Sequence, residues 1–479
     1  MSDIKKTRVY PPKQCRELPR SKDSYPFSAA DHLAEPIDLS AYGFEEREFI
    51  IKGNSNVYEW PIGQEYPTIR TPDSPYCTRL LIRRPANPET FNGIVVVEPM
   101  NYASKYDRSI PGWGHCYEYY LERGMAWIGV AIRDVALEAM KRFDPGRYGE
   151  LGYPNPLPPE ERGEPAKSYG HTSKDSENGL IWDMLSQLGA LLKSDSPENP
   201  MAGYPVKKIM ATAATGGDLS CYVRAIHPLH CLEEEKPVYD GFLIYMTGAP
   251  GMINQVTPKL QETDPRCLYY SEVPFIHVLT TGDMVGGGFH PDWAYMQRRP
   301  DADEPGKKLH RYEIAGCGVR AGYDKKRCVC REDVEKSQTP WREDVHYEYE
   351  FPVRYILRAA NEALISWMMD GIEPPHSPLL EFEGAYPETV FVRDEVGNTK
   401  GGIRTPYVDA PLYRYREEGG ASRLPDETIQ MLYKNKDAYL EKVILSTVRA
   451  VQNRFLLAED SAKVILEAVH ERFPEEVTE

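Results

Sequence analysis

The chain has 479 residues, a formal net charge of −16, a hydrophobic fraction of 41% and a charged fraction of 27%. These fractions are ordinary for a globular protein, and an acidic surface argues against nucleic acid or an anionic membrane as the main partner. The N-terminal segment lacks the apolar stretch of a secretory signal, and no run of about 18 apolar residues is present to span a membrane. We therefore expect a cytoplasmic protein whose partner is a small molecule. The sequence is also consistent with a homo-oligomer.

Nine cysteines are scattered along the chain, an odd number that favours thiols in a reducing compartment. Cys317, Cys328 and Cys330 lie close together, but no fourth ligand stands near them, so we predict no metal site. We also predict no cofactor, because the glycines of "TGDMVGGGFH" lack the spacing of a nucleotide-binding fingerprint. The 32 tyrosines suit a pocket for a sizeable, partly apolar ligand, and suit a tyrosine-rich core equally well.

The first half of the chain predicts a βαβ unit. Residues 1–40 are polar and proline-rich and are expected to form an N-terminal arm. Residues 47–60 alternate between apolar and polar, as a strand or hairpin does. Residues 114–124 predict a short helix that ends at a glycine. The short apolar runs at 77–85, 94–97 and 125–132 predict strands, and the continuous run at 94–97 is typical of a strand buried in a parallel sheet.

The second half continues the alternation of strands and helices. Residues 144–175 are rich in proline, glycine and charge, which predicts a long loop that covers a site. Helices are predicted at 177–194, 354–371 and 440–455, and strands at 207–213, 239–248, 273–283 and 307–316. This order predicts a mostly parallel α/β sheet flanked by helices. We expect one domain over 41–479, with a cap-like insertion near 144–175 and a helical C-terminal extension near 425–475.

The stretch "KIMATAATGGDLSCYVRAIHP" has the pattern of a nucleophile elbow, with a strand, a turn of small residues and then a helix. Small neighbours are needed because the residue at the tip is held at a strained backbone conformation. The spacing places Ala213 at the tip and Thr215 in the turn. A threonine hydroxyl acts as a nucleophile only with a base beside it, so we expect Thr215 to pack within the turn.

The elbow and its surroundings resemble the α/β-hydrolase domain-containing proteins, whose elbow reads roughly G-x-S-Q-S-(G/A). The likeness extends, in order, over "TRLLIRRPANPETFNGIVVVEPMN", "RGMAWIGVAIRD", "DPGRYGEL", "YVRAIHP", "DGFLIYMTG", "ALISWMMDGIEPP", "GGIRTPYVDAP" and "FLLAEDSAKVI". It covers nearly all of residues 40–470. The resemblance therefore implies the α/β-hydrolase fold.

The resemblance also implies a triad in the chain order nucleophile, acid and base. The nucleophile position falls on Ala213, followed by Ala214, and the acid position falls on Asp283. The base position, in the block "AG-x-x-H", falls on Val319, which cannot accept a proton. Two of the three members are thus replaced.

Other residues are candidates for the chemistry that remains. Cys317 and His290 lie in loops expected to face the pocket, and Tyr222 is a candidate for proton transfer. Backbone donors after Ala213 do not depend on its side chain, so an oxyanion site is expected to survive. Its other donors are expected from the loop after the strand at 94–97. The predicted substrate-binding residues are Glu98, Met100, Asn101, Ala214 and Tyr222.

Three functions follow as hypotheses. The first is an enzyme that acts on a small carbonyl-containing substrate by lyase, isomerase or cyclase chemistry at the retained oxyanion site. The second is an esterase, lactonase or amidase in which the elbow serine has been exchanged for Ala213. The third is a binding protein without catalytic activity. We favour an enzyme, because the glycines of the turn are intact and the loops are long.

Overall fold

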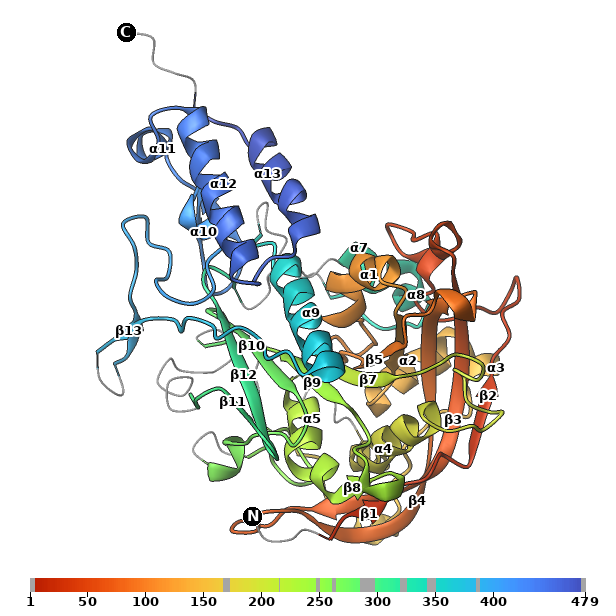
Figure 1. The fold of residues 1–479 in the computed structure, drawn as a ribbon. Helices are drawn as coiled ribbons and strands as arrows, with labels where there is room; N and C mark the ends of the chain where they lie inside the picture. Colours follow the sequence, from red (N-terminus) through yellow and green to blue (C-terminus); the bar gives the residue numbers. More distant parts are fainter. Residues whose placement is uncertain are drawn as a thin grey trace. The chain divides into compact units, whose positions relative to one another are not determined.

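The computed structural model describes residues 5–166, 173–214, 216–246, 250–260, 264–284, 298–318, 325–342, 350–384 and 388–474. Three of the residues predicted from the sequence, Thr215, His290 and Val319, lie outside these ranges. The chain divides into two compact units (Figure 1). Unit 1 comprises Met1–Phe275, Pro305–Lys307 and Asp324–Glu343, and unit 2 comprises Ile276–Glu304, Lys308–Tyr323 and Asp344–Glu479.

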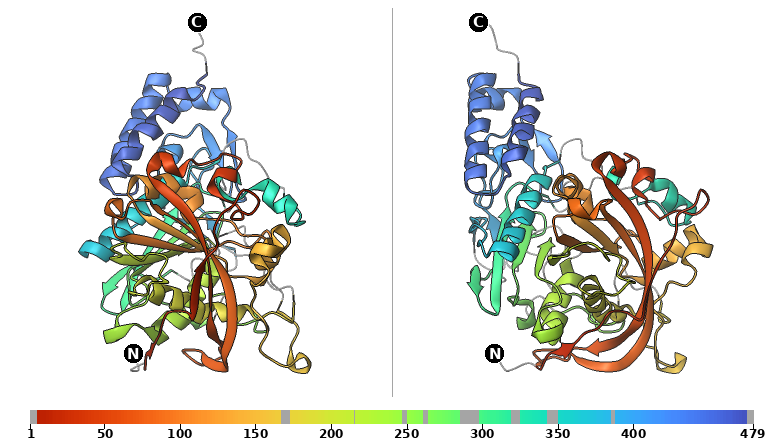
Figure 2. Two further views of the ribbon diagram at one scale, coloured as in Figure 1. Left: turned by 90° about the vertical axis from the view of Figure 1, so that its right-hand side faces the viewer. Right: turned by 45° about the vertical axis from the view of Figure 1, so that its right-hand side comes forward.

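The sheet of unit 1 has parallel strands followed by antiparallel ones, in the order β9-β7-β5-β6-β4-β3-β2. Strands β5, β6, β7 and β9 run parallel, whereas β4 pairs antiparallel with β6 and β3, and β2 pairs antiparallel with β3. Figure 2 shows β3 and β4 as long, strongly curved strands. The strands are β2 (Gln14–Glu17), β3 (Phe44–Glu59), β4 (Thr68–Pro85), β5 (Ile94–Pro99), β6 (Ala126–Val130), β7 (Lys208–Ala213) and β9 (Gly241–Tyr245).

The parallel strands carry the continuous apolar runs that the sequence analysis assigned to a buried sheet. All residues of β5, β6 and β9 are buried, as expected where helices cover both faces. The predicted helix at 114–124 is confirmed as α1, and Gly124 follows it at φ +66°, where a side chain would be strained. The helices of unit 1 are α1 (Gly112–Glu122), α2 (Asp134–Phe143), α3 (Pro145–Tyr148), α4 (Ile181–Leu192), α5 (Gly216–Cys221), α7 (Lys325–Cys328) and α8 (Arg331–Lys336).

In unit 2, β10 and β12 pair in parallel, with Ile276 opposite His310 and Thr280 opposite Ile314. The predicted helix at 354–371 is confirmed as α9, and Gly371 closes it in the left-handed conformation. The long helix near the C-terminus begins earlier than predicted, because the Asn435 side chain caps it by accepting a hydrogen bond from the Ala438 N–H at 2.9 Å. The longer elements of unit 2 are β10 (Phe275–Thr280), β12 (Lys307–Ile314), α9 (Arg354–Asp370), α11 (Asp426–Leu432), α12 (Lys436–Gln452) and α13 (Ser461–His470), of which β10 and β12 each begin with one residue assigned to unit 1.

The remaining elements are short. Strand β1 (Thr7–Arg8) pairs with β8 (His230–Cys231) in unit 1. In unit 2, β13 (Phe382–Glu383) pairs with β14 (Val390–Phe391), and β15 (Tyr413–Tyr415) pairs with β16 (Ala421–Arg423). Unit 2 also holds β11 (Ala302–Glu304) and α10 (Pro406–Asp409).

The N-terminal arm is more ordered than its composition predicts. Residues 14–17 form β2, which pairs with β3 from Gln14 opposite Lys52 to Glu17 opposite Phe49. Beyond β2, the Arg147 guanidinium donates hydrogen bonds to the carbonyls of Leu18 and Pro19, both at 2.9 Å. These partners lie far away in the sequence, so a polar, proline-rich composition does not reveal them.

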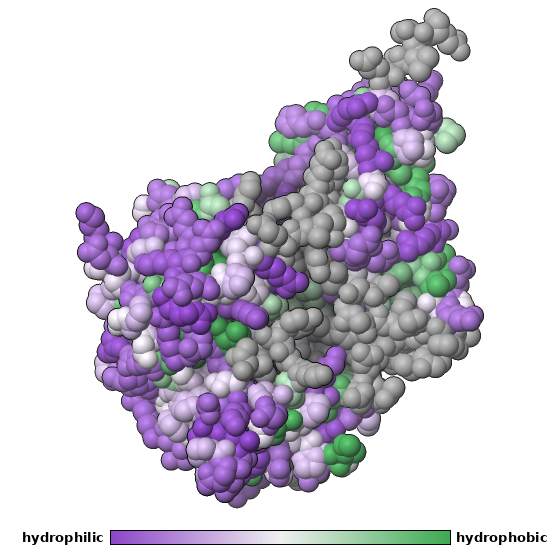
Figure 3. All heavy atoms as spheres, turned by 180° about the vertical axis from the view of Figure 1, so that it is seen from behind, coloured by the Kyte–Doolittle hydropathy of each residue, from purple (hydrophilic) through white to green (hydrophobic). Residues whose placement is uncertain are grey.

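The described surface on the face drawn in Figure 3 is mostly hydrophilic, and its apolar residues stand in small separate groups. A hydrophilic surface is expected from the charged fraction of 27% and the net charge of −16. Among the described helices, none combines the length and the apolar character needed to cross a membrane.

The N-terminal arm depends on a carboxylate buried beneath it. Glu48, with an exposed fraction of 0%, accepts hydrogen bonds from Arg79 Nε (2.6 Å), Arg147 Nε (2.5 Å) and Tyr148 OH (2.7 Å). We predict that Glu48→Gln lowers the free energy of unfolding by about 3–5 kcal/mol, because two buried guanidinium groups lose their counter-ion. Urea unfolding measures the change. The partly exposed pair of Glu17 and Arg47 provides the control, and Glu17→Gln should cost less than about 1 kcal/mol. Equal costs in both variants would contradict the prediction.

Candidate functional site

The predicted elbow falls at the carboxyl end of β7. Ala213 is the last residue of that strand and its side chain is fully buried, and α5 begins at Gly216. Strands β5, β6 and β7 are parallel, so their carboxyl ends meet at one edge of the sheet. In sheets of this kind ligands bind at that edge. The loops that follow β5, β6 and β7 are therefore the candidate site in unit 1.

Three of the backbone donors expected for an oxyanion site, in the part of the turn and loop that the structure describes, are engaged. The Ala214 N–H donates to the carbonyl of Ile110 at 3.1 Å. In the loop after β5, the N–H groups of Met100 and Asn101 donate to the carbonyls of Val130 and Arg108, both at 2.9 Å. A ligand oxygen would have to displace one of these carbonyls before it could bind there. The oxyanion site therefore stays a prediction.

The side chains of Asn101 and Glu98 hold this loop in place. The Asn101 Oδ1 atom accepts hydrogen bonds from the Ala103 N–H at 3.1 Å and from Arg108 Nη2 at 2.9 Å. The fully buried Glu98 carboxylate accepts from the Trp113 N–H at 2.9 Å and from two further donors, Gly112 N–H and Trp127 Nε1. Burial raises the pKa of Glu98 to about 7. Both residues thus orient the backbone between β5 and α1.

Tyr222, a further predicted binding residue, lies in the core of unit 1 with its hydroxyl already paired. It opens a π-helical turn after α5 (Tyr222–Ile226), and its hydroxyl lies 2.7 Å from Ser186 Oγ. The Ser186 hydroxyl in turn lies 2.8 Å from His230 Nδ1. Tyr222 is thereby tied to α4 and β8.

Three polar residues that the sequence analysis did not select meet at the same edge of the sheet. Arg133 follows β6, Asp218 stands in the first turn of α5, and the two form a buried ion pair. The Arg133 guanidinium also lies 5.1 Å from the centre of the Tyr102 ring, which follows β5. Burial raises the pKa of Tyr102 well above its ordinary value, and the negative charge of Asp218 adds to the effect, so its hydroxyl keeps its proton. Each of the three strand ends supplies one member of this group, which we call the edge triad.

Two atoms of the edge triad have no partner within the described part of the chain. These are Arg133 Nε and Asp218 Oδ2, and both are buried. A buried donor and a buried acceptor without partners cost stability unless a further group meets them. The only sequence signal for these residues is their position, since each is a polar residue that closely follows an apolar strand.

In unit 2, the loops predicted to carry the triad acid and base lie side by side. The Cys317 carbonyl accepts hydrogen bonds from Thr281 Oγ1 at 2.7 Å and from the Gly282 N–H at 3.1 Å. The fully buried Asp283 carboxylate accepts from the N–H and hydroxyl of Thr280, at 2.9 and 2.8 Å. Burial raises the pKa of Asp283 to about 7. The structure therefore brings Asp283 and Cys317 together, and the Cys317 side chain is buried.

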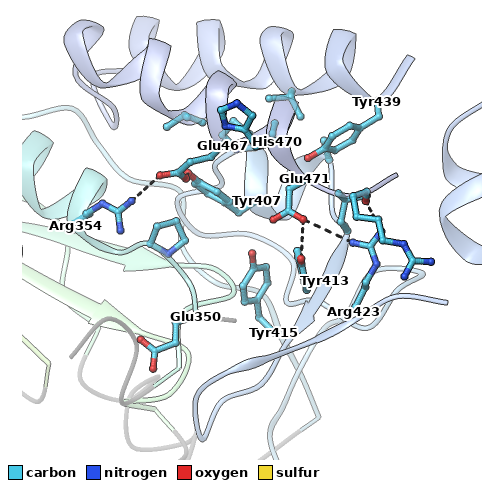
Figure 4. Close-up of a pocket in the computed structure, with 18 residues that line it drawn as sticks. Glu350, Arg354, Tyr407, Tyr413, Tyr415, Arg423, Tyr439, Glu467, His470 and Glu471 are labelled. Atoms are coloured by element: carbon cyan, nitrogen blue, oxygen red, sulfur yellow. Dashed lines mark hydrogen bonds and ion pairs between the residues drawn. The ribbon is translucent and has the colours of Figure 1, made fainter. Parts of the chain in front are cut away.

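A cavity of about 690 Å³ lies in unit 2 beside α13, and tyrosines and charged residues line it (Figure 4). Its carboxylates are already engaged. Glu467 accepts hydrogen bonds from Arg354, Tyr355 and Tyr407, and Glu471 accepts one from Tyr413. The cavity matches the tyrosine-rich pocket that the composition made plausible, although no single sequence motif marks it.

Comparison with known proteins identifies the family. Residues 11–466 match the family described as alpha/beta hydrolase domain. No curated protein matches the sequence. A solved structure from Klebsiella pneumoniae described as a dienelactone hydrolase is 13% identical, over 60% of this chain and 95% of that one, with a TM-score of 0.28. The apo form of Thermogutta terrifontis esterase 2 is 12% identical, over 54% and 83% of the two chains, with a TM-score of 0.27. A lipase/esterase from Lactobacillus plantarum is 6% identical, over 46% and 80%, with a TM-score of 0.26.

The raised pKa of Asp283 predicts a stability that depends on pH. The folded state binds the Asp283 proton more tightly than the unfolded state, whose carboxyl has a pKa of about 3.9. The free energy of unfolding should therefore fall by up to about 4 kcal/mol as the pH rises from about 4 to about 7. Asp283→Asn should remove this contribution and leave that of Glu98, so the decline should become shallower, and urea unfolding at a series of pH values measures it. The exposed Asp195→Asn variant should keep the wild-type slope, and a slope unchanged in Asp283→Asn would refute the prediction.

Proposed function

Because the chain belongs to the alpha/beta hydrolase domain family, we propose that it is an enzyme for a small carbonyl-containing organic substrate and that it works without an acyl-serine intermediate. The observation that carries the proposal is the carboxyl end of β7. There the elbow presents the buried methyl group of Ala213, and the neighbouring Ala214 N–H is paired with a backbone carbonyl.

Acyl transfer needs a nucleophile and a base that removes its proton. The Ala213 side chain has no proton to lose, and the base position of the family falls on Val319 in the sequence. What the edge of the sheet does offer is a permanent positive charge, a neutral hydroxyl and a carboxylate. These are the groups needed to polarise a carbonyl and to move a proton.

The edge triad suggests a specific assignment. The unpaired Nε–H of Arg133 donates to the substrate carbonyl oxygen, and the unpaired Oδ2 of Asp218 accepts the proton from the adjacent carbon. The C–H bond breaks, its electron pair forms the carbon–carbon double bond of an enolate, the π pair of the carbonyl moves to its oxygen, and an O–H bond forms on Asp218. Tyr102 keeps its proton and can donate it to the oxygen or to a leaving group. Enolisation, elimination and cyclisation all begin in this way.

This assignment predicts that the protein exchanges the α-protons of a carbonyl substrate with solvent. We propose to incubate the full chain in D₂O with a panel of small ketones, keto acids and lactones and to follow deuterium uptake by NMR. Tyr102→Phe and Asp218→Asn should each slow uptake roughly 100-fold or more, the range expected when a proton-transfer group is lost. Tyr239→Phe is the matched control, since its buried hydroxyl donates to the Leu185 carbonyl, and it should keep the wild-type rate. Uptake that is unaffected by Tyr102→Phe and Asp218→Asn would overturn the assignment.

A second measurement separates this proposal from a disabled hydrolase. Ala213→Ser is assayed on short acyl esters and lactones, with mass spectrometry for an acyl adduct. We expect neither turnover nor adduct, because a serine at residue 213 would still lack a base. Turnover with an adduct confined to the serine variant would instead establish a hydrolase that lacks only its nucleophile. Absence of turnover and of α-proton exchange with every compound would favour a binding protein.

A further inference from the structure

Three potential metal ligands from separate segments converge in unit 2. Asp301 precedes β11, His310 lies within β12, and His376 follows α9. One ligand atom from each lies within 4.8 Å of the other two. The Asp301 Oδ2 atom is 2.8 Å from His376 Nδ1 and 3.5 Å from His310 Nδ1.

The buried His310 ring has one nitrogen satisfied and one without a partner. Its Nε2 lies 3.0 Å from Glu373 Oε1, and a carboxylate can only accept, so Nε2 carries the hydrogen. Its Nδ1 then carries a lone pair, and this atom is buried without a hydrogen-bond partner among the described residues. It faces the Asp301 carboxylate across 3.5 Å.

Two electron-rich atoms that face each other in a buried position repel unless a cation lies between them. The cation is either a second proton on His310 or a metal ion. The donor set of two imidazole nitrogens and one carboxylate oxygen is typical of zinc.

We propose that His310 Nδ1, His376 Nδ1 and Asp301 Oδ2 bind a divalent transition metal of the zinc type, with water as the fourth ligand. His376 now donates Nδ1–H to Asp301, and it can bind the metal by carrying its proton on Nε2 instead. Its side chain is 71% exposed, which provides an entry path for the ion and an open position for water.

Neighbouring groups already orient the three ligands. Glu373 fixes the tautomer of His310, as a carboxylate behind a metal-bound histidine commonly does. The Arg311 N–H donates to Asp301 Oδ1 at 2.9 Å, which leaves Oδ2 directed at the two rings. The Trp367 ring packs edge-on against His310 at a centroid distance of 5.1 Å. A metal ion here would tie the segment after α9 to β12 and stabilise unit 2.

The test uses the full chain, stripped of metal with a chelator, and adds Zn²⁺, Co²⁺ or Mg²⁺ alone. We expect Zn²⁺ to bind one-to-one in calorimetry and to raise the thermal unfolding midpoint, whereas Mg²⁺ does neither. Co²⁺ should give visible absorption bands of a four-coordinate site. His376→Ala should abolish the shift in the midpoint, and Glu373→Gln should weaken Zn²⁺ binding about 10–100-fold.

Two further variants guard against general effects. Asp301→Asn keeps an acceptor for the Arg311 N–H, so it should fold normally and still lose Zn²⁺ binding. His470→Ala removes another exposed histidine of unit 2 and should bind Zn²⁺ as the wild type does. Absence of Zn²⁺ binding in the wild type would overturn the proposal and leave a protonated His310 as the cation. Equal binding in wild type, His376→Ala and Asp301→Asn would overturn it as well.

Discussion

The Arg133–Asp218 ion pair is the interaction on which the candidate site of unit 1 depends. It links the loop after β6 to the first turn of α5, and Arg133 Nη1 also donates to the carbonyl of Asn178 at 3.3 Å. Asn178 in turn accepts a hydrogen bond from the Asp134 N–H at 2.9 Å. A charge pair with an exposed fraction of a few per cent is retained only where its geometry is good, because removing either partner leaves the other buried and uncompensated. The pair therefore anchors the first turn of α5 to the loop after β6.

The buried carboxylates of this chain differ in the partners that hold them. Glu48 forms ion pairs with Arg79 and Arg147, whereas the hydrogen bonds that Glu98 and Asp283 accept come from neutral donors, and Arg83 acts on Glu98 only through its charge. For Glu98 and Asp283 the cost of burying charge exceeds the gain from the hydrogen bonds, so their pKa values rise to about 7.

Local sequence patterns predict the parts of this fold that depend on local physics. The continuous apolar run at 94–97 indicated β5, and the glycine at residue 371, left-handed in the structure, marked the end of α9. The small residues around Ala213 placed the elbow at the end of β7. By contrast, β2 depends on an edge of β3 far away in the sequence, and the edge triad depends on three strand ends that meet only after folding. A single sequence does not reveal contacts between segments that are far apart along the chain. Each member of the edge triad, taken alone, is an ordinary polar residue that follows a strand.

The same limitation applies to metal ligands, because a sequence shows which residues are close along the chain but not which ones meet after folding. Cys317, Cys328 and Cys330 are close in sequence, yet all three are buried thiols. Asp301, His310 and His376 have no motif spacing, but the parallel pairing of β12 with β10 fixes His310 in the interior, and the segment after α9 brings His376 to its side. The edge triad and this cluster illustrate one physical rule. A buried acceptor needs a hydrogen-bond donor or a cation: Arg133 supplies it to Asp218, and a metal ion is proposed to supply it to His310 and Asp301.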